Sequence, residues 1–320
     1  PDDVGPEDLK KLVWTTSLGS EPVALTAAAG RVFTCTPETH QVHALDAENG
    51  RILWSYTAGS RVDSPPTLYH GLVLFGCSDG YVYCLRAEDA ELVWRFRAAP
   101  ADRRMVNENQ LESIWPLHGA VLVKDDRLYA TAGRTSLLDG GLAVYALDPN
   151  TGSVQAQNRI YDAYPEAEAG MIGNQGHSYT EGLLGVHNEI MMDDPSGICL
   201  RQLRMDENLV PAGRTETHLI SISGILNPNW FSRIGAYFGQ PTKTSRGQRG
   251  DYDYLDSPRQ GAYIIFDRER SYSLRVHPNM GKFMVSFVPG KEGYRVFADD
   301  NLTSENVWNI HVPISVQAMV

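Results

Sequence analysis

Charged and aromatic residues that could bind a ligand are concentrated in three stretches of the first half of the chain. The stretches are residues 60–66 (SRVDSPP), 98–118 and 133–141 (GRTSLLDGG). Guanidinium groups bind carboxylates through paired hydrogen bonds, and aromatic faces stack on planar groups. This mixture predicts a site for a carboxylate, a sugar or a peptide segment. Its candidate residues are Arg61, Asp63, Arg103, Arg104, Glu112, Trp115, His118, Arg134 and Asp139.

The same charged residues could instead pair with one another. Arg61 lies two positions from Asp63, and Arg104 and Glu112 lie in one polar insertion. Ion pairs at a protein rim stabilise it by at most about 1 kcal/mol, but they can hold loops in place. This second interpretation predicts the pairs Arg61–Asp63 and Arg104–Glu112 and no ligand site.

Other chemistry has weaker signals in the sequence. The four cysteines lack metal-ligand spacing, so we predict buried free thiols. The stretch DYDYLD, residues 251–256, could offer three carboxylates to calcium, but it lacks the glycine and closing glutamate of an EF-hand loop and fits a solvated loop better. No serine-nucleophile motif or phosphate loop is present. The sequence predicts no catalytic residue and no metal site.

The elements that must position these residues repeat along the chain. VHALDAENGRILW, residues 42–54, predicts a strand, a tight turn at Asn49-Gly50 and a second strand that contains a tryptophan. VYCLRAEDAELVW has the same arrangement, and VYALDPNTGSVQA has Ala156 in place of the tryptophan. Trp14, Trp54 and Trp94 follow one another at intervals of 40 residues. A period of this length indicates a repeat architecture.

Each repeat contains enough strands for one blade of a β-propeller. Apolar arms (GRVFTC, GLVLFG and DRLYAT) precede the three turn motifs, which gives about four short strands per unit. Several strands are apolar on both faces, as expected for a sheet packed between two others. We predict an all-β propeller of seven to eight four-stranded blades, truncated or closed by pairing of the chain ends. Four tryptophans should cover the next blade as structural residues: Trp14, Trp54, Trp94 and Trp308.

The repeats resemble the quinoprotein-like, or PQQ-binding-like, β-propeller family, whose blades carry a motif close to Ala-x-Asp-x-x-Thr-Gly-x-x-x-Trp. The copies here read ALDAENGRILW, CLRAEDAELVW and ALDPNTGSVQA. The resemblance extends over roughly residues 10–160 and implies a propeller. The chain looks most like the non-catalytic branch of the family, which includes outer-membrane assembly lipoproteins, and this implies a binding scaffold.

The dehydrogenases of the same family imply a different function. They need the quinone PQQ, a calcium ion held by acidic and amide oxygens, an aspartate base, a tryptophan floor and often a vicinal cysteine pair. No adjacent cysteines occur here, and no acidic set aligns with the family motif, so no catalytic residue is carried over. A PQQ-dependent dehydrogenase and a carbohydrate-active propeller enzyme remain the alternatives to a scaffold without cofactor.

Composition and family together set expectations for partners and location. The 320 residues carry a net charge of −11, which disfavours nucleic acid, and no stretch is apolar enough to span a membrane. We expect a protein or glycan partner and a periplasmic or extracellular bacterial protein that is a processed or excised piece. Residues 1–11 should be a linker or loose edge, and residues 12–320 one propeller with loop insertions near 98–116, 161–182 and 240–261.

Overall fold

The computed structural model describes residues 12–161, except 108 and 137, and shorter segments of the second half. The described segments beyond residue 161 are 186, 188, 190–194, 197–200, 203–214, 219–221, 236–238, 242–243, 252–253, 259–261, 264–266, 269–275, 294–300 and 305–312. Residues 1–11, residues 162–182 of the predicted insertion at 161–182, and most of the predicted insertion at 240–261 lie outside the described residues.

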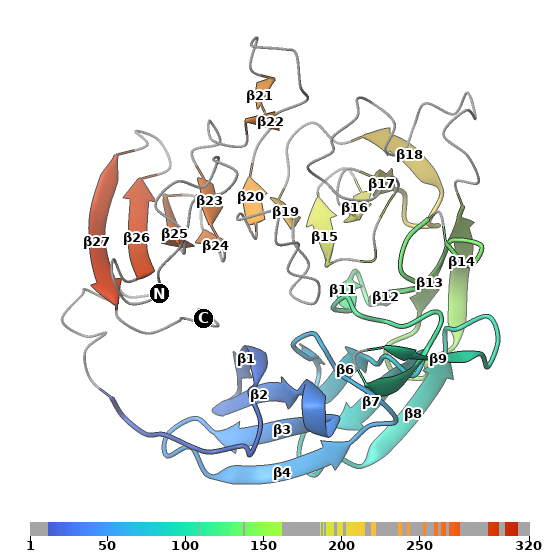
Figure 1. Cartoon of the computed structure of the whole chain (residues 1–320), viewed down its shortest axis with the longest axis horizontal. Coiled ribbons are helices and arrows are strands. Elements are labelled where there is room, and N and C mark those ends of the chain that lie inside the picture. The colour runs from blue at the N-terminus through green and yellow to red at the C-terminus, as the bar shows by residue number, and fades with distance from the viewer. Residues whose placement is uncertain are drawn as a thin grey trace.

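The chain is an all-β propeller built from antiparallel four-stranded sheets, as predicted. Figure 1 shows these sheets following one another around the molecule in chain order. The first sheet contains β1 (Val23–Ala28), β2 (Arg31–Thr36), β3 (Gln41–Asp46) and β4 (Ile52–Thr57). The second contains β5 (Thr67–Tyr69), β6 (Leu72–Gly76), β7 (Tyr81–Arg86) and β8 (Leu92–Arg97). The third contains β11 (Leu122–Lys124), β12 (Arg127–Ala132), β13 (Leu142–Leu147) and β14 (Val154–Ile160).

Two further four-stranded sheets lie in the second half of the chain. One contains β15 (Met191–Asp194), β16 (Gly197–Leu200), β17 (Leu203–Met205) and β18 (Pro211–Arg214). The other contains β24 (Ile264–Phe266), β25 (Arg270–Arg275), β26 (Tyr294–Asp300) and β27 (Asn306–Val312). Between them, β19 (Leu219–Ser221), β20 (Ala236–Phe238) and β23 (Arg259–Gly261) form a three-stranded sheet, and β21 (Thr242–Lys243) pairs with β22 (Tyr252–Asp253). The number of seven to eight blades stays a prediction.

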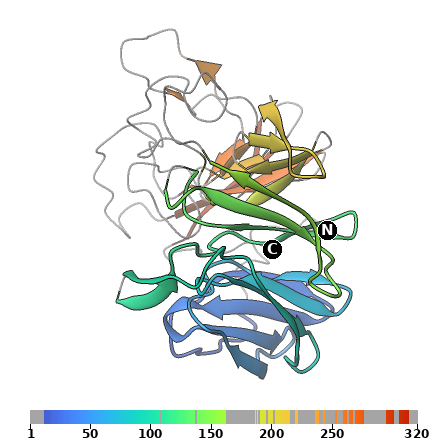
Figure 2. The same ribbon diagram turned by 90° about the vertical axis from the view of Figure 1, so that its right-hand side faces the viewer.

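The predicted insertion at 98–116 contains a two-stranded hairpin. Its strands are β9 (Arg104–Asn107) and β10 (Gln110–Ser113), which pair only with each other. Figure 2 shows this hairpin projecting beyond the four-stranded sheets. The sequence indicated a polar loop here, and the structure adds a short antiparallel pair.

Four of the sheets share one irregularity in their third and fourth strands. The register shifts immediately after the pairs Ala44↔Trp54, Cys84↔Trp94, Ala146↔Ala156 and Ala298↔Trp308. A β-bulge at this point bends the outer strand and increases its twist. The tryptophan position of the repeat therefore has a fixed place, directly beside the bulge.

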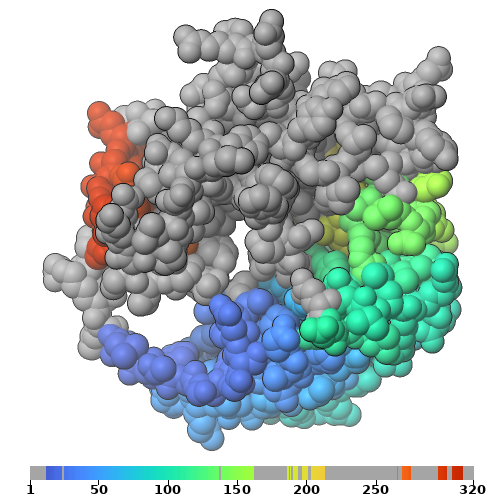
Figure 3. All heavy atoms as spheres, viewed as in Figure 1, coloured from blue at the N-terminus to red at the C-terminus, as the bar shows by residue number. Residues whose placement is uncertain are grey.

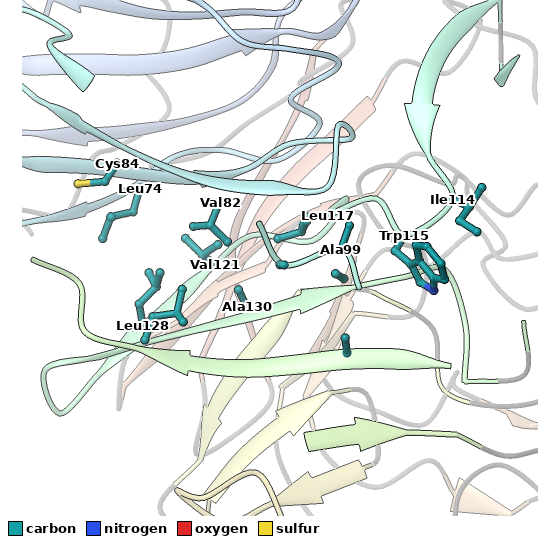
Figure 4. Close-up of a cluster of buried hydrophobic side chains, with 14 residues drawn as sticks. Leu74, Val82, Cys84, Ala99, Ile114, Trp115, Leu117, Val121, Leu128 and Ala130 are labelled. Atoms are coloured by element: carbon teal, nitrogen blue, oxygen red, sulfur yellow. The ribbon is translucent and has the colours of Figure 1, made fainter. Parts of the chain in front are cut away.

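The core lies between neighbouring sheets. Leu74, Val82 and Cys84 of the second sheet face Leu128 and Ala130 of the third, and all five side chains are buried (Figure 4). Similar apolar clusters join the first sheet to the second and the third to the fourth. In the space-filling view the first three sheets form one continuous packed body (Figure 3). Burial on both faces explains why these strands lack alternating polar residues.

The four cysteines are buried thiols that form no disulfide, as the sequence predicted. Burial raises the pKa of the Cys84 thiol to about 12. Burial also raises the pKa of the Cys35 thiol, and the nearby Asp63 carboxylate adds to this effect. Such thiols are protonated at neutral pH and behave as small apolar side chains.

Within the described residues, no helix has the length and apolar character needed to cross a membrane.

Candidate functional site

Antiparallel strand order divides the connections of each sheet between two ends. The tight turns β1–β2 and β3–β4, and their equivalents in the next sheets, lie at one end, which we call the turn end. The loops β2–β3, the connections between sheets and their equivalents lie at the other, which we call the loop end. Most of the residues singled out by the sequence lie on loop-end connections at 58–66, 98–121 and 133–141.

At the turn end, one contact recurs between neighbouring sheets. The indole Nε1 of Trp54 in β4 donates to the Ala87 carbonyl in the β7–β8 turn at 2.9 Å. Trp94 in β8 donates in the same way to Pro149 at 3.0 Å, and Trp14, which precedes β1 without being in a strand, donates to Ala47 at 2.9 Å. Each of these tryptophans thus lies on the β-turn of the sheet that follows it.

Turn backbones at this end leave room for the indoles. Gly50 and Gly152 adopt φ of +74° and +71°. A Cβ on Gly50 would lie 2.4 Å from Cε3 of Trp14, and one on Gly152 would lie 2.7 Å from Cε3 of Trp94. Glycine is therefore favoured both by the left-handed conformation and by the close approach of the ring.

The fourth structural candidate, Trp308, lies in β27 opposite Ala298. This is the same place that Trp54 and Trp94 occupy opposite Ala44 and Cys84. The Trp308 ring centroid lies 6.3 Å from that of Tyr272 in β25.

At the loop end, the Asp63 carboxylate joins three connections. Its Oδ1 accepts a hydrogen bond from Nε of Arg61 at 3.0 Å. Its Oδ2 accepts one from Oγ of Ser78 at 3.0 Å and lies 2.9 Å from Nδ1 of His118. Asp63 is 1% exposed, whereas the side chains of Arg61 and His118 are 15% and 20% exposed. The carboxylate is therefore buried beneath two basic groups that reach the surface.

The neighbouring side chains determine the protonation state of Asp63. Burial alone raises its pKa, but the hydrogen bond and charge of His118, the charge of Arg61 and the Ser78 hydroxyl together outweigh burial and leave the pKa below its ordinary value. Asp63 is ionised at neutral pH. As an ionised and fully bonded group, it can anchor loops.

Glu112 forms a second buried pair. Its Oε1 accepts a hydrogen bond from Nη2 of Arg134, whose Nη1 donates to the Ile114 carbonyl at 2.8 Å. Glu112 is 1% exposed, and its Oε2 is buried without a hydrogen-bond partner among the described residues. The predicted pair Arg104–Glu112 is not formed, because Arg104 lies opposite Ser113 and its Nε is 3.3 Å from Oδ1 of Asp102.

Trp115, Arg103 and Asp139 meet near this second pair. The Trp115 indole donates to the Asp139 carbonyl at 2.9 Å, and the Arg103 guanidinium carbon lies 6.0 Å from the ring centroid. Trp115 is 6% exposed. Its ring therefore packs inside the protein and does not present an open face to a ligand.

Sequence reasoning missed two residues that hold the loop end together. Ser78 links Asp63 to the hairpin, since its backbone carbonyl accepts from the Ser113 amide at 2.7 Å. The buried Asn188 amide lies within 3.1 Å of the carbonyls of Pro116, Thr131 and Gly133. Neither lies in a repeat motif, so no sequence signal distinguished them from ordinary turn residues.

A metal centre is not visible in the described part of the chain, where no group of three or more His, Cys, Asp or Glu side chains could hold an ion. Asp251 and Asp256 of the DYDYLD stretch lie outside the described residues.

Comparison with known proteins identifies a family and several similar folds. The family described as outer membrane protein assembly factor BamB matches residues 8–173, just over half of the chain. No curated protein sequence matches.

Solved structures give further matches. BamB from Moraxella catarrhalis is 12% identical with a TM-score of 0.40, and the match covers 93% of this chain and 64% of the BamB chain. The computationally designed protein Ika8 is 11% identical with a TM-score of 0.47, covering 96% of this chain and 92% of Ika8. The quinohemoprotein alcohol dehydrogenase ADHIIG from Pseudomonas putida HK5 is 17% identical with a TM-score of 0.43, covering 94% of this chain and 44% of the enzyme. All three TM-scores are too low to support a conclusion about function.

Proposed function

The chain belongs to the PQQ-like repeat β-propeller family described as outer membrane protein assembly factor BamB, and we propose that it acts as a non-catalytic scaffold that binds a protein partner. Family membership gives the architecture of the chain, and the scaffold role is our proposal, because a fold does not by itself determine a function. We propose also that it works in the periplasm or cell envelope of a bacterium.

The observation that carries the proposal is the use of the two buried carboxylates at the loop end. Asp63 accepts from side chains of three separate segments, and Glu112 accepts from Arg134 across 22 residues of sequence. A catalytic acid, base or nucleophile must reach the substrate. Two carboxylates that are each 1% exposed and bonded to neighbouring loops support a rigid platform instead.

We propose that this platform needs neither PQQ nor calcium for its function. A direct test is to add both to the purified chain and follow dye-linked alcohol oxidation. We expect no turnover above the same mixture without protein. Oxidation that requires protein, quinone and calcium together would make the chain a dehydrogenase and contradict the scaffold proposal.

The binding half of the proposal needs an independent experiment. The tagged chain is first crosslinked in cells of the source bacterium, and the envelope proteins attached to it are identified. We expect at least one of them, after purification, to bind the purified chain with a saturable stoichiometry in calorimetry. Asp89→Ala, which removes the exposed ion-pair partner of Arg86 in the β7–β8 turn at the opposite end of the sheets, is a control that should bind equally well. If every captured protein fails to bind in purified form, the chain is not a protein scaffold.

A further inference from the structure

One free strand edge lies outside the four-stranded sheets, in the β9–β10 hairpin. Strand β9 pairs with β10 on one side only, and no backbone hydrogen bond joins Arg104 or Val106 to any described residue on the other side. Val106 is 70% exposed, and its cross-strand partner Leu111 is 52% exposed. The free edge of β9 therefore carries the uncovered aliphatic side chain of Val106, next to the exposed Leu111 on β10.

The outer strands of the blades present other side chains. Each of these outer strands has exposed polar residues at alternate positions. They are Ser55 and Thr57 in β4, Arg95 and Arg97 in β8, and Gln155 and Gln157 in β14. Polar and charged residues at such edges prevent pairing with another chain. In β9 the corresponding exposed residues include Met105 and Val106. Val106 thus interrupts the polar pattern with a largely exposed aliphatic side chain, on a hairpin that projects beyond the four-stranded sheets (Figure 2).

The hydrogen-bond pattern shows which backbone groups of β9 are available. In an antiparallel pair, residues alternate between bonding their partner and pointing away from it. On β10, Leu111 and Ser113 point away, since the Leu111 carbonyl accepts from Ser60 Oγ at 2.9 Å and the Ser113 amide donates to the Ser78 carbonyl at 2.7 Å. Their partners Val106 and Arg104 must point away on the opposite side, where no described residue makes a backbone hydrogen bond to them.

The hairpin is held in place from several directions. The Gln110 side chain lies 2.8 Å from Nε2 of His40 and donates to Glu38 at 2.9 Å, both in the β2–β3 loop of the first sheet. With the bonds to Ser60 and Ser78, these contacts fix β10 against two sheets and leave β9 outside. A preorganised edge binds a partner without first having to be ordered.

We propose that the free edge of β9 is the docking site for an extended segment of a protein partner, which adds to the hairpin as a third strand. Unpaired amide and carbonyl groups at alternate residues are complementary to another strand and to no other secondary structure. Val106 selects an aliphatic side chain on the added strand, with Leu111 behind it on β10, and Arg104, on the same face, selects a carboxylate beside it. This inference rests on the proposed protein-binding function and assigns its surface.

A labelled peptide tests the edge directly. The probe is a short peptide in which valine and threonine alternate and one position is glutamate, and fluorescence anisotropy reports its binding to the full chain. We expect saturable binding with a Kd below about 1 mM, and slowed amide hydrogen exchange at Val106 when the peptide is present. The same peptide N-methylated at alternate amides, which cannot pair as a strand, should not bind.

Substitutions separate backbone pairing from general stickiness. Val106→Pro removes an outward amide that makes no bond within the hairpin, so the fold should survive and peptide affinity should fall about tenfold or more. Val106→Thr keeps the β-branched shape and should lower affinity about threefold. Val93→Thr, at an equally apolar exposed site on β8, is the matched control and should change nothing.

The outcomes distinguish this inference from the scaffold proposal. No peptide binding by the native chain, or equal binding by Val106→Pro with an intact circular dichroism spectrum, overturns the docking site. A purified partner that binds Val106→Pro as tightly as the native chain has the same meaning and leaves the scaffold function in place. Failure to find any partner of the native chain concerns the scaffold proposal alone.

Discussion

At the turn end of the sheets, neighbouring sheets are joined by one repeated contact, the indole of one sheet on the turn of the next. At the loop end, each junction uses a different set of charged side chains, Asp63 with Arg61, Ser78 and His118 at one and Glu112 with Arg134 at another. The first kind of contact buries a large apolar ring and makes one hydrogen bond. The second kind buries a carboxylate, and removing one member of such a pair leaves the other uncompensated.

The two kinds of contact between sheets differ in how readily they can be repeated along the chain. A contact that depends on one residue per repeat can be copied from sheet to sheet without regard to neighbours. A buried carboxylate needs donors placed on other loops, so each junction is individual. The loop end is also where the β9–β10 hairpin is attached, through Ser60, Ser78 and His40. The turn end thus provides the architecture, and the loop end carries the features particular to this chain.

The largest expected change in the free energy of unfolding comes from a substitution at the turn end. Trp54 is 9% exposed and packs between the first two sheets, so Trp54→Ala should lower the free energy of unfolding by about 3–5 kcal/mol. Trp94 is only partly buried, and Trp94→Ala should cost less. Urea unfolding followed by circular dichroism measures both. A loss below about 1 kcal/mol for Trp54→Ala would show that the repeated indole contact does not hold the sheets together.

The second largest expected change in stability comes from a substitution at the loop end. Asp63→Ala leaves Arg61, Ser78 and His118 without their shared acceptor and should destabilise by about 2–4 kcal/mol, below the full cost of an orphaned buried charge because the side chains of Arg61 and His118 both reach solvent. The matched control is Asp102→Ala, which removes an exposed ion-pair partner of Arg104 and should change stability by less than about 0.5 kcal/mol. Equal effects in the two variants would remove the distinction between the ends.

Smaller changes in stability are expected from substitutions at equivalent turn positions of the second and third sheets. Gly152→Ala places a Cβ against Trp94 at a φ of +71° and should destabilise by about 1–2 kcal/mol. Ala90 occupies the equivalent turn of the second sheet with a φ of +64°, so Ala90→Gly should stabilise by up to about 1 kcal/mol. Thermal unfolding of both variants measures the pair. Changes of the same sign would contradict the equivalence of the two turns.

The smallest effect is a pH dependence at the loop end of the first sheet. His43 is 3% exposed, with Nε2 2.9 Å from Oγ1 of Thr36 and Nδ1 2.8 Å from Oγ of Ser55, and burial lowers its pKa. The unfolded state therefore binds a proton first, and stability should fall as pH drops below about 6.5, by at most about 1.4 kcal/mol per pH unit.

A substitution isolates this contribution. His43→Gln, which cannot titrate, should have a flatter stability profile between about pH 6.5 and 5. Asp63, whose pKa is also lowered, loses its contribution only at more acidic pH, below its unfolded value of about 3.9. A His43→Gln profile as steep as that of the native chain would assign the slope to other groups.

Much of the turn end could be predicted because its information is local. A strand, a turn with Asp46 and Gly50, and a tryptophan four residues later are all specified within one repeat, and the 40-residue interval fixes the recurrence. The loop-end ion pairs could be predicted only where they are also local, as for Arg61 and Asp63. The prediction Arg104–Glu112 was wrong because the hairpin register places Met105, not Arg104, opposite Glu112.

The sequence by itself determined the all-β repeat, the burial of the strands on both faces and the outer-strand position of the tryptophans, since strand alternation and turn chemistry act over a few residues. Only the tertiary structure decided that Arg134 and Glu112 pair, that Trp115 faces inward, and that Val106 remains on a free edge. These contacts join segments from different connections whose relative positions depend on how the sheets pack. The short-range pattern of residues carries no information about such distances.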